Sequence, residues 1–129
     1  MKMYILVNEN IEMSAGKLAG QVGHAITSYI VDISSNNSLL KVQMLDWYNN
    51  HNQTKIILKC KQKKLEELES IGYISVRDLG KTELEPNTIT CVNLGILDED
   101  DLCNDLKFVK RLRLYRFTST TLKASWFYA

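Results

Sequence analysis

Histidine, proline and cysteine are scarce in this chain of 129 residues. It has two histidines, one proline and three cysteines, and Cys60, Cys91 and Cys103 follow no metal-binding or redox spacing. Scattered cysteines without a secretion signal indicate reduced thiols in a cytosolic protein. No apolar run approaches the ~20 residues of a membrane span, and the N-terminal segment turns polar too early for a signal peptide. We therefore expect a cytoplasmic protein with no membrane segment and no metal site.

The net charge favours no class of partner, because 16 basic side chains nearly balance 15 acidic ones. The distribution of charge is more informative than the sum. Residues 55–64 contain five lysines and no acid, and residues 110–123 contain five basic side chains and no acid. One such run is usually a solvated face. Two runs on one small domain favour a phosphate-binding surface.

Residues 14–33 have the pattern of one amphipathic helix that follows a short strand. Ser14 suits the N-cap, because its hydroxyl can accept a bond from a first-turn amide. One face is apolar and predicted to be buried; it comprises Leu18, Val22, Ala25, Ile26, Tyr29, Ile30 and Ile33. Another face repeats polar side chains at the same spacing; it comprises Lys17, Gln21, His24 and Ser28.

Gly16, Gly20 and Gly23 lie within the first turns of this helix. A glycine inside a helix costs about 1 kcal/mol relative to alanine. Their number therefore suggests that something approaches the helix backbone closely. Either a neighbouring strand or a substrate would satisfy this requirement.

Strands and helices alternate along the rest of the chain. We expect strands at 3–7, 55–60, 73–77 and 88–94, helices at 38–48 and 62–70, a short helix at 98–106 and a strand-like segment at 112–117. This order predicts an α/β fold: a single three-layer α/β/α domain with a four-stranded mixed sheet flanked by helices. Binding sites in such sheets lie at strand ends, which directs attention to Lys17 and Asp78.

Two segments together resemble the signature blocks of the archaeal/eukaryotic-type peptidyl-tRNA hydrolases. The segments are GKLAGQVGHA (16–25) and RDLGKTELEPNTITCVNLGI (77–96), close to the family patterns GKxAAQxxHA and DAGxTQxxPGxxTxLGIGP. The intervening DWYNNHNQTKIILKC (46–60) resembles the family's tryptophan-containing segment and the lysine-bearing strand after it. The resemblance covers residues 1–108 and implies a peptidyl-tRNA hydrolase-like domain, followed by a C-terminal extension, 109–129, packed on or beside it.

The resemblance implies hydrolysis of the ester that joins a peptide to tRNA, without metal or cofactor, by a protein that is often a homodimer. Positions matching the family's catalytic residues are Lys17, Asp78, Thr82 and Thr90. Positions expected to contact the substrate are Gln21, His24, Lys55, Lys59 and Lys81. Ester hydrolysis needs a positioned water, a proton acceptor and a group that stabilises the oxyanion. Asp78 could orient or deprotonate the water, and Lys17 could hold a phosphate or the oxyanion.

Each of these residues also has a simpler interpretation. Lys17 could be a solvated first-turn lysine, and Asp78 could only cap a turn. A histidine such as His24 more often satisfies a buried hydrogen bond than takes part in catalysis, and we keep that interpretation for it. The resemblance favours function for Lys17 and Asp78, as it does for Thr82. For Thr90 and Gln21 both interpretations stay open.

The chain departs from the family pattern at several positions. These are Asn8, Asn10, Leu79, Glu83, Asn87, Asn93 and Ile96. Asn87 stands where glycine is usual, and asparagine still tolerates a positive φ. The departures leave two alternatives open: a catalytically impaired family member that acts as an RNA- or protein-binding module, and a different hydrolase or transferase that uses the same pocket.

Overall fold

A four-stranded mixed sheet forms the centre of the fold, as the sequence predicts. The computed structural model describes residues 1–36, 38–80 and 84–116. The strands are β1 (Lys2–Asn8), β2 (Lys55–Cys60), β3 (Ile74–Arg77) and β4 (Ile89–Leu97), in the order β2-β1-β4-β3. β1 and β2 are parallel, and β4 is antiparallel to both β1 and β3. The carboxyl ends of β1, β2 and β3 therefore lie at the same end of the sheet, where β4 begins.

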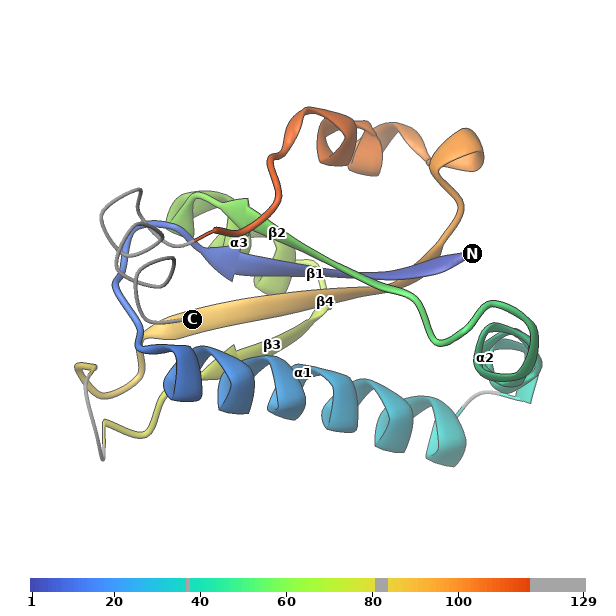
Figure 1. The fold of residues 1–129 in the computed structure, drawn as a ribbon, viewed down its shortest axis with the longest axis horizontal. Helices are drawn as coiled ribbons and strands as arrows, with labels where there is room; N and C mark the ends of the chain where they lie inside the picture. The colour runs from blue at the N-terminus through green and yellow to red at the C-terminus, as the bar shows by residue number, and fades with distance from the viewer. Residues whose placement is uncertain (37, 81–83, 117–129) are drawn as a thin grey trace, which may run out of the picture.

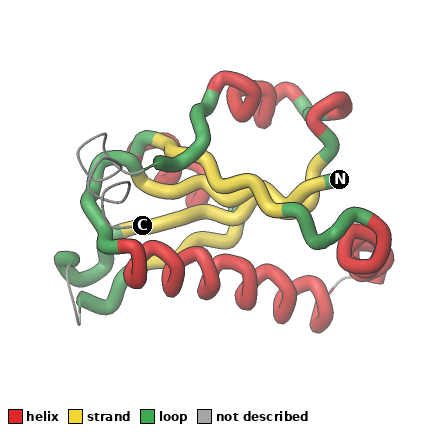
Figure 2. Tube along the Cα trace, in the orientation of Figure 1, coloured by secondary structure: helices red, strands yellow, loops and turns green. Residues whose placement is uncertain are grey.

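Helices cover both faces of this sheet and complete three layers (Figures 1 and 2). One face is covered by α1 (Ala15–Asn36) and α2 (Ser38–Asn50), and the other by α3 (Gln62–Ser70) and the 3-10 helix η2 (Asn104–Arg111). The predicted α/β/α architecture is thus confirmed. None of the described helices is both long and apolar enough to cross a membrane.

The central strand β1 is buried on both faces because its side chains alternate between two cores. Met3, Ile5 and Val7 pack toward α1 and α2, whereas Tyr4 and Leu6 pack toward α3 and η2. All five are at most 1% exposed. Full burial of a Val, Leu or Ile side chain contributes about 1.5–3 kcal/mol, so this strand anchors both helical layers.

The long helix α1 forms as predicted. Ser14 Oγ accepts a hydrogen bond from the Lys17 amide at 3.2 Å, which is the expected N-cap. The predicted apolar stripe packs into the core on this face of the sheet. Because α1 begins at the end of the sheet where β1, β2 and β3 finish, its first turns lie beside Arg77 and Asp78.

Two sequence expectations for the C-terminal region were wrong. Residues 98–106 do not form one short helix; they contribute to two 3-10 segments, η1 (Glu99–Asp101) and η2. Residues 112–116 do not form a strand either, and only Leu114 makes a bridge, to Leu58. The Lys59 amide donates to the Arg113 carbonyl and the Tyr115 amide to the Ile57 carbonyl, both at 2.9 Å. This short segment therefore lies along the outer edge of β2.

Candidate active site

Lys17 and Asp78 form an ion pair where α1 begins and β3 ends. The Lys17 ammonium donates a hydrogen bond to Asp78 Oδ1. The side chains are only 12% and 4% exposed. Lys17 is therefore not a solvated surface lysine, and the two residues highlighted by the sequence meet in space.

Two donors hold the Asp78 carboxylate in its ionised form. The hydrogen bond from Lys17 lowers the pKa of Asp78 below its ordinary value, and the Gly80 amide, which donates to Oδ2 at 2.9 Å, lowers it further. Burial by itself would raise the pKa of Asp78, but the hydrogen bonds outweigh it. The bond to Gly80 is the turn-capping contact of the simpler interpretation, so Asp78 caps the turn and pairs with Lys17 at once.

The loop that carries Asp78 is closed at its base by two backbone hydrogen bonds. The Asp78 amide donates to the Thr88 carbonyl at 2.8 Å, and the Asn87 amide donates to the Asp78 carbonyl at 2.7 Å. Asn87 has φ +68°, so the positive φ expected where the family has glycine is present. Gly80 has φ +75°, and a side chain there would meet Pro86 at 2.6 Å. This turn therefore requires glycine.

A bulge in β4 places Thr90 against Gln21 of α1. Val76 pairs with Cys91 and Arg77 with Ile89, so Thr90 is the extra residue in the ladder. The Thr90 hydroxyl lies 2.7 Å from Gln21 Oε1 and 3.1 Å from the Val76 carbonyl, both of which can accept its proton. Thr90 is fully buried and Gln21 is 6% exposed. The bulge thus links β4 to α1 through the hydrogen bond between Thr90 and Gln21.

An open groove lies between α1 and β3, and the fully buried Thr90 does not line it. It is lined by Lys17, Gln21, His24, Ser28, Ser75, Val76, Arg77, Asp78 and Leu79. The four polar residues predicted to share one face of α1 all line it. His24 is exposed in this groove, so our interpretation of it as a buried, hydrogen-bonded histidine was wrong. Leu79 is 75% exposed at the rim.

The glycines of α1 do not accommodate a strand. A Cβ atom added at Gly16, Gly20 or Gly23 would meet nothing within 4 Å in the described part of the chain. The first of our two explanations, close packing of a neighbouring strand, was therefore wrong. Approach of a substrate to the helix backbone stays a prediction.

Asn8 and Asn10, two of the positions where the chain departs from the family pattern, tie three segments together. Asn8 Nδ2 donates to the Ile89 carbonyl at 2.8 Å and to Gln62 Oε1 at 3.0 Å. Asn10 Oδ1 accepts from the Gln62 amide at 2.7 Å, which caps the start of α3. Both asparagine side chains therefore have a structural role.

The remaining predicted site residues lie outside the groove or outside the described structure. Lys55 and Lys59 lie on β2, at the opposite edge of the sheet from β3. The Lys55 ammonium stacks over the Trp47 ring, 5.1 Å from its centroid. Lys81 and Thr82 fall outside the described residues, as does Glu83.

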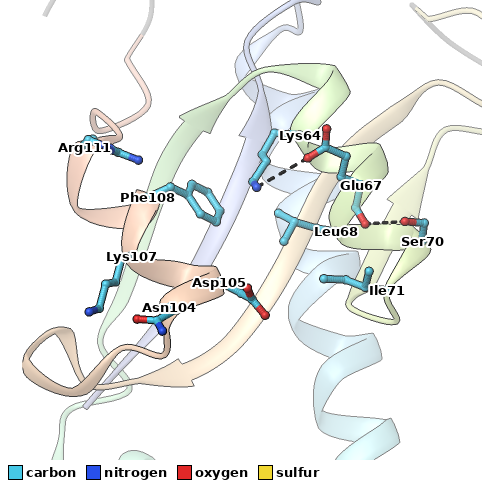
Figure 3. A pocket seen from close by; sticks show the side chains of 10 residues that line it. All are labelled: Lys64, Glu67, Leu68, Ser70, Ile71, Asn104, Asp105, Lys107, Phe108 and Arg111. Atoms are coloured by element: carbon cyan, nitrogen blue, oxygen red, sulfur yellow. Dashed lines mark hydrogen bonds and ion pairs between the residues drawn. The ribbon is translucent and has the colours of Figure 1, made fainter.

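Sequence reasoning missed Arg77 and Ser75 as groove residues, and it also missed Glu69, which binds both. The available signal was a basic residue directly before Asp78. A second hollow, between α3 and η2 on the opposite face of the sheet, has mixed charge (Figure 3). Among the described residues, no cluster of three or more His, Cys, Asp or Glu side chains could hold a metal ion.

Comparison with known proteins assigns the family. The family model described as Peptidyl-tRNA hydrolase PTH2 matches residues 1–115. The chain belongs to the peptidyl-tRNA hydrolase PTH2 family. Proteins named peptidyl-tRNA hydrolase are 35% identical to it over 119 residues in Saccharolobus solfataricus and 36% identical over 122 residues in Sulfolobus acidocaldarius. Each alignment covers 84% of this chain, and 99% and 100% of the respective relative.

Membership in the peptidyl-tRNA hydrolase PTH2 family confirms the resemblance drawn from the two sequence blocks. The match to the family model extends beyond residue 108 to the segment that lies along β2. The Lys17–Asp78 pair thus lies in a fold and a family where ester hydrolysis is the expected chemistry.

Proposed function

We propose that this protein hydrolyses the ester bond of peptidyl-tRNA and releases free tRNA and peptide. The observation that carries the proposal is the largely buried Lys17–Asp78 ion pair, which lines an open groove, in a member of the peptidyl-tRNA hydrolase family. The groove leaves room for an extended substrate, and the pair supplies a carboxylate and an ammonium at one point.

The lowered pKa of Asp78 favours one of its two possible roles. A carboxylate with a pKa below its ordinary value is a weak base at neutral pH. Asp78 therefore acts chiefly by orienting the attacking water. Water adds to the ester carbonyl carbon, and the Lys17 ammonium stabilises the resulting oxyanion. Collapse breaks the bond to the ribose oxygen, which takes the proton lost by the water and leaves as a hydroxyl of the tRNA.

Thr90 supports this reaction through Gln21. Its buried hydroxyl hydrogen-bonds Gln21, and Gln21 lines the groove beside Lys17. The Gln21 side chain is thereby held in one orientation toward the substrate. His24 adds a polar contact one turn further along α1. We assign Thr82 a role in orienting water or the substrate carbonyl, as its match to the family motif implies.

We further propose that the tRNA backbone contacts basic residues on the α1 side of the sheet. Ile57 packs toward α1, so Lys55 and Lys59, two residues away on either side, project to the same face. The segment along β2 sets Arg113 beside Lys59, and Lys81 follows the Asp78 turn in the sequence. Binding through these groups should weaken steeply with salt, since each neutralised phosphate releases counterions. A flat affinity between low and moderate salt would contradict this surface.

We further propose that the protein forms a homodimer and is located in the cytoplasm. The outer faces of α1 and α2 expose Val31, Leu39, Val42, Leu45 and Tyr48, each at least 50% accessible. Exposed apolar patches mark interaction sites, and we assign this one to a second copy of the chain. Sedimentation should show a dimer that Val42→Glu dissociates. As a hydrolase of peptidyl-tRNA, the protein would work in the cytoplasm.

The decisive experiment measures release of tRNA from purified peptidyl-tRNA. Wild-type protein should cleave it, and the Lys17→Ala and Asp78→Ala variants should not. A folded wild-type protein that leaves peptidyl-tRNA intact would overturn the proposed function.

A further inference from the structure

Arg77 directly precedes Asp78, and its guanidinium joins three separate segments. Nε and Nη2 donate to the two carboxylate oxygens of Glu69, at 3.0 and 2.7 Å. Nη1 donates to the Asn87 carbonyl at 2.6 Å. One planar group therefore connects the last turn of α3, the end of β3 and the return of the loop that carries Asp78.

The carboxylate of Glu69 accepts three hydrogen bonds in this arrangement. Besides Arg77, it accepts a hydrogen bond from the Ser75 hydroxyl at 2.5 Å. The bonds from Arg77 and then from Ser75 lower the pKa of Glu69, and the bond to Glu69 raises the pKa of Arg77. Both groups stay charged at working pH. The two side chains are 37% and 29% exposed, so burial does not set this pair apart. Its two parallel hydrogen bonds distinguish it from a loose surface pair.

The hydrogen bond from Arg77 to Asn87 acts on the base of the catalytic loop. The Asn87 amide in turn donates to the Asp78 carbonyl. The carbonyl of Asn87 is thus bound by the Arg77 side chain, and its amide is bound by the Asp78 carbonyl. On its opposite side, the Asp78 carboxylate is held by Lys17. The backbone of Asp78 is therefore linked to Arg77 through Asn87, and its side chain is held by the ion pair with Lys17.

We propose that the Glu69–Arg77 pair is a positioning unit that sets the geometry of Asp78 for hydrolysis. This inference rests on the proposed function. Neither residue needs to touch the substrate. Loosening the pair would let the loop base shift, and a misplacement of about 1 Å at a reacting group can reduce the rate by up to about 100-fold.

The test uses the chain of 129 residues and two conservative variants. Arg77→Lys keeps the charge but cannot reach Glu69 and Asn87 together, and Glu69→Gln removes a charge-assisted bond with little change of shape. We expect kcat on peptidyl-tRNA to fall roughly tenfold in each variant, with KM within about twofold of wild type. The double variant should be no slower than the slower single variant, because both changes break one unit.

A second readout separates positioning from simple loss of folded protein. Carboxyl ¹³C NMR titration reports the pKa of Asp78, which Lys17 lowers in the wild type. A shifted loop weakens that contact, so the pKa of Asp78 should rise toward its ordinary value in both variants. All rates are scaled to the folded fraction measured by circular dichroism.

Glu67→Gln is the matched control. Glu67 lies on the same helix, two residues from Glu69, and pairs with Lys64 at 3.6 Å (Figure 3). It lines the hollow between α3 and η2 rather than the groove between α1 and β3. This variant should leave kcat and the pKa of Asp78 unchanged. Values of kcat and pKa in Arg77→Lys and Glu69→Gln equal to those of this control would overturn the inference. A raised KM confined to Arg77→Lys would also overturn it, because Arg77 would then contact the substrate.

Failure of the inference and failure of the proposed function give different results. If the wild-type protein does not cleave peptidyl-tRNA, the proposed function fails, and the NMR titration still tests whether the pair positions Asp78. If the wild type cleaves and the variants match the control, only the positioning inference fails.

Discussion

The Lys17 ammonium and the Asp78 carboxylate, 61 positions apart in the sequence, form a hydrogen-bonded ion pair at the floor of the α1–β3 groove. α1 supplies the cation from its first turn, and the end of β3 supplies the anion. This pair unites a carboxylate and an ammonium where the substrate would lie.

Replacing either member of the pair should remove activity without unfolding the protein. Asp78→Asn keeps the size of the side chain but removes its charge, so water and Lys17 both lose their partner. We expect kcat to fall at least ~100-fold, as measured by tRNA release. Circular dichroism spectra should match wild type. Substantial cleavage by Asp78→Asn would show that another group positions the water.

The hydroxyl of Thr90 should matter for both stability and activity. Thr90→Val keeps the shape but leaves the buried Gln21 oxygen without its donor, which costs about 1–3 kcal/mol in the free energy of unfolding. Activity should fall because Gln21 is no longer oriented. Thr90→Ser retains the hydroxyl and should stay close to wild type in denaturant titrations and in rate. Equal stability of the Val and Ser variants would argue against the bond.

Substitution of Gly20 should separate stability from function. The position is open, so Gly20→Ala should raise the free energy of unfolding by up to about 1 kcal/mol through helix propensity. If the substrate approaches this backbone, kcat/KM should nevertheless fall. Ser34→Ala, at an exposed position near the other end of α1, is the control. A more stable Gly20→Ala enzyme with full activity would exclude close approach at this position.

The three cysteines should differ sharply in reactivity. Cys103 is exposed, whereas Cys60 and Cys91 are buried, and burial raises the pKa of each buried thiol to about 11. A thiol reagent at pH 8 should label one site quickly in the native protein and three in denaturant. Rapid native labelling of all three would show that the core opens readily.

The same buried thiols predict how stability changes with alkaline pH. Their folded pKa values lie above the ordinary value of 9.0, so the folded state holds these protons after the unfolded state has lost them. Their contribution to stability is complete below about pH 9 and is lost as pH rises through about 11. Urea titrations at pH 8, 9 and 10 should show a falling free energy of unfolding. Cys91→Ala should flatten the fall.

Local pattern was enough to predict most elements of this fold. The apolar stripe of α1, the N-cap at Ser14 and the bounds of β2 and α3 follow from side-chain periodicity and turn chemistry, which act over a few residues. The segment after β4 was harder to predict, because 3-10 turns and a single bridge at Leu114 leave no periodic signal.

The sequence by itself determined the α/β architecture, the family and the identity of Lys17 and Asp78 as candidates, because motif spacing and periodicity are properties of the chain. Only the tertiary structure decided that these two side chains meet, that His24 is exposed, that a bulge turns Thr90 toward Gln21, and that Arg77 binds Glu69 and Asn87. Each of these depends on strand register and on which helix covers which face. Such contacts join residues distant in the sequence, and no local pattern encodes them.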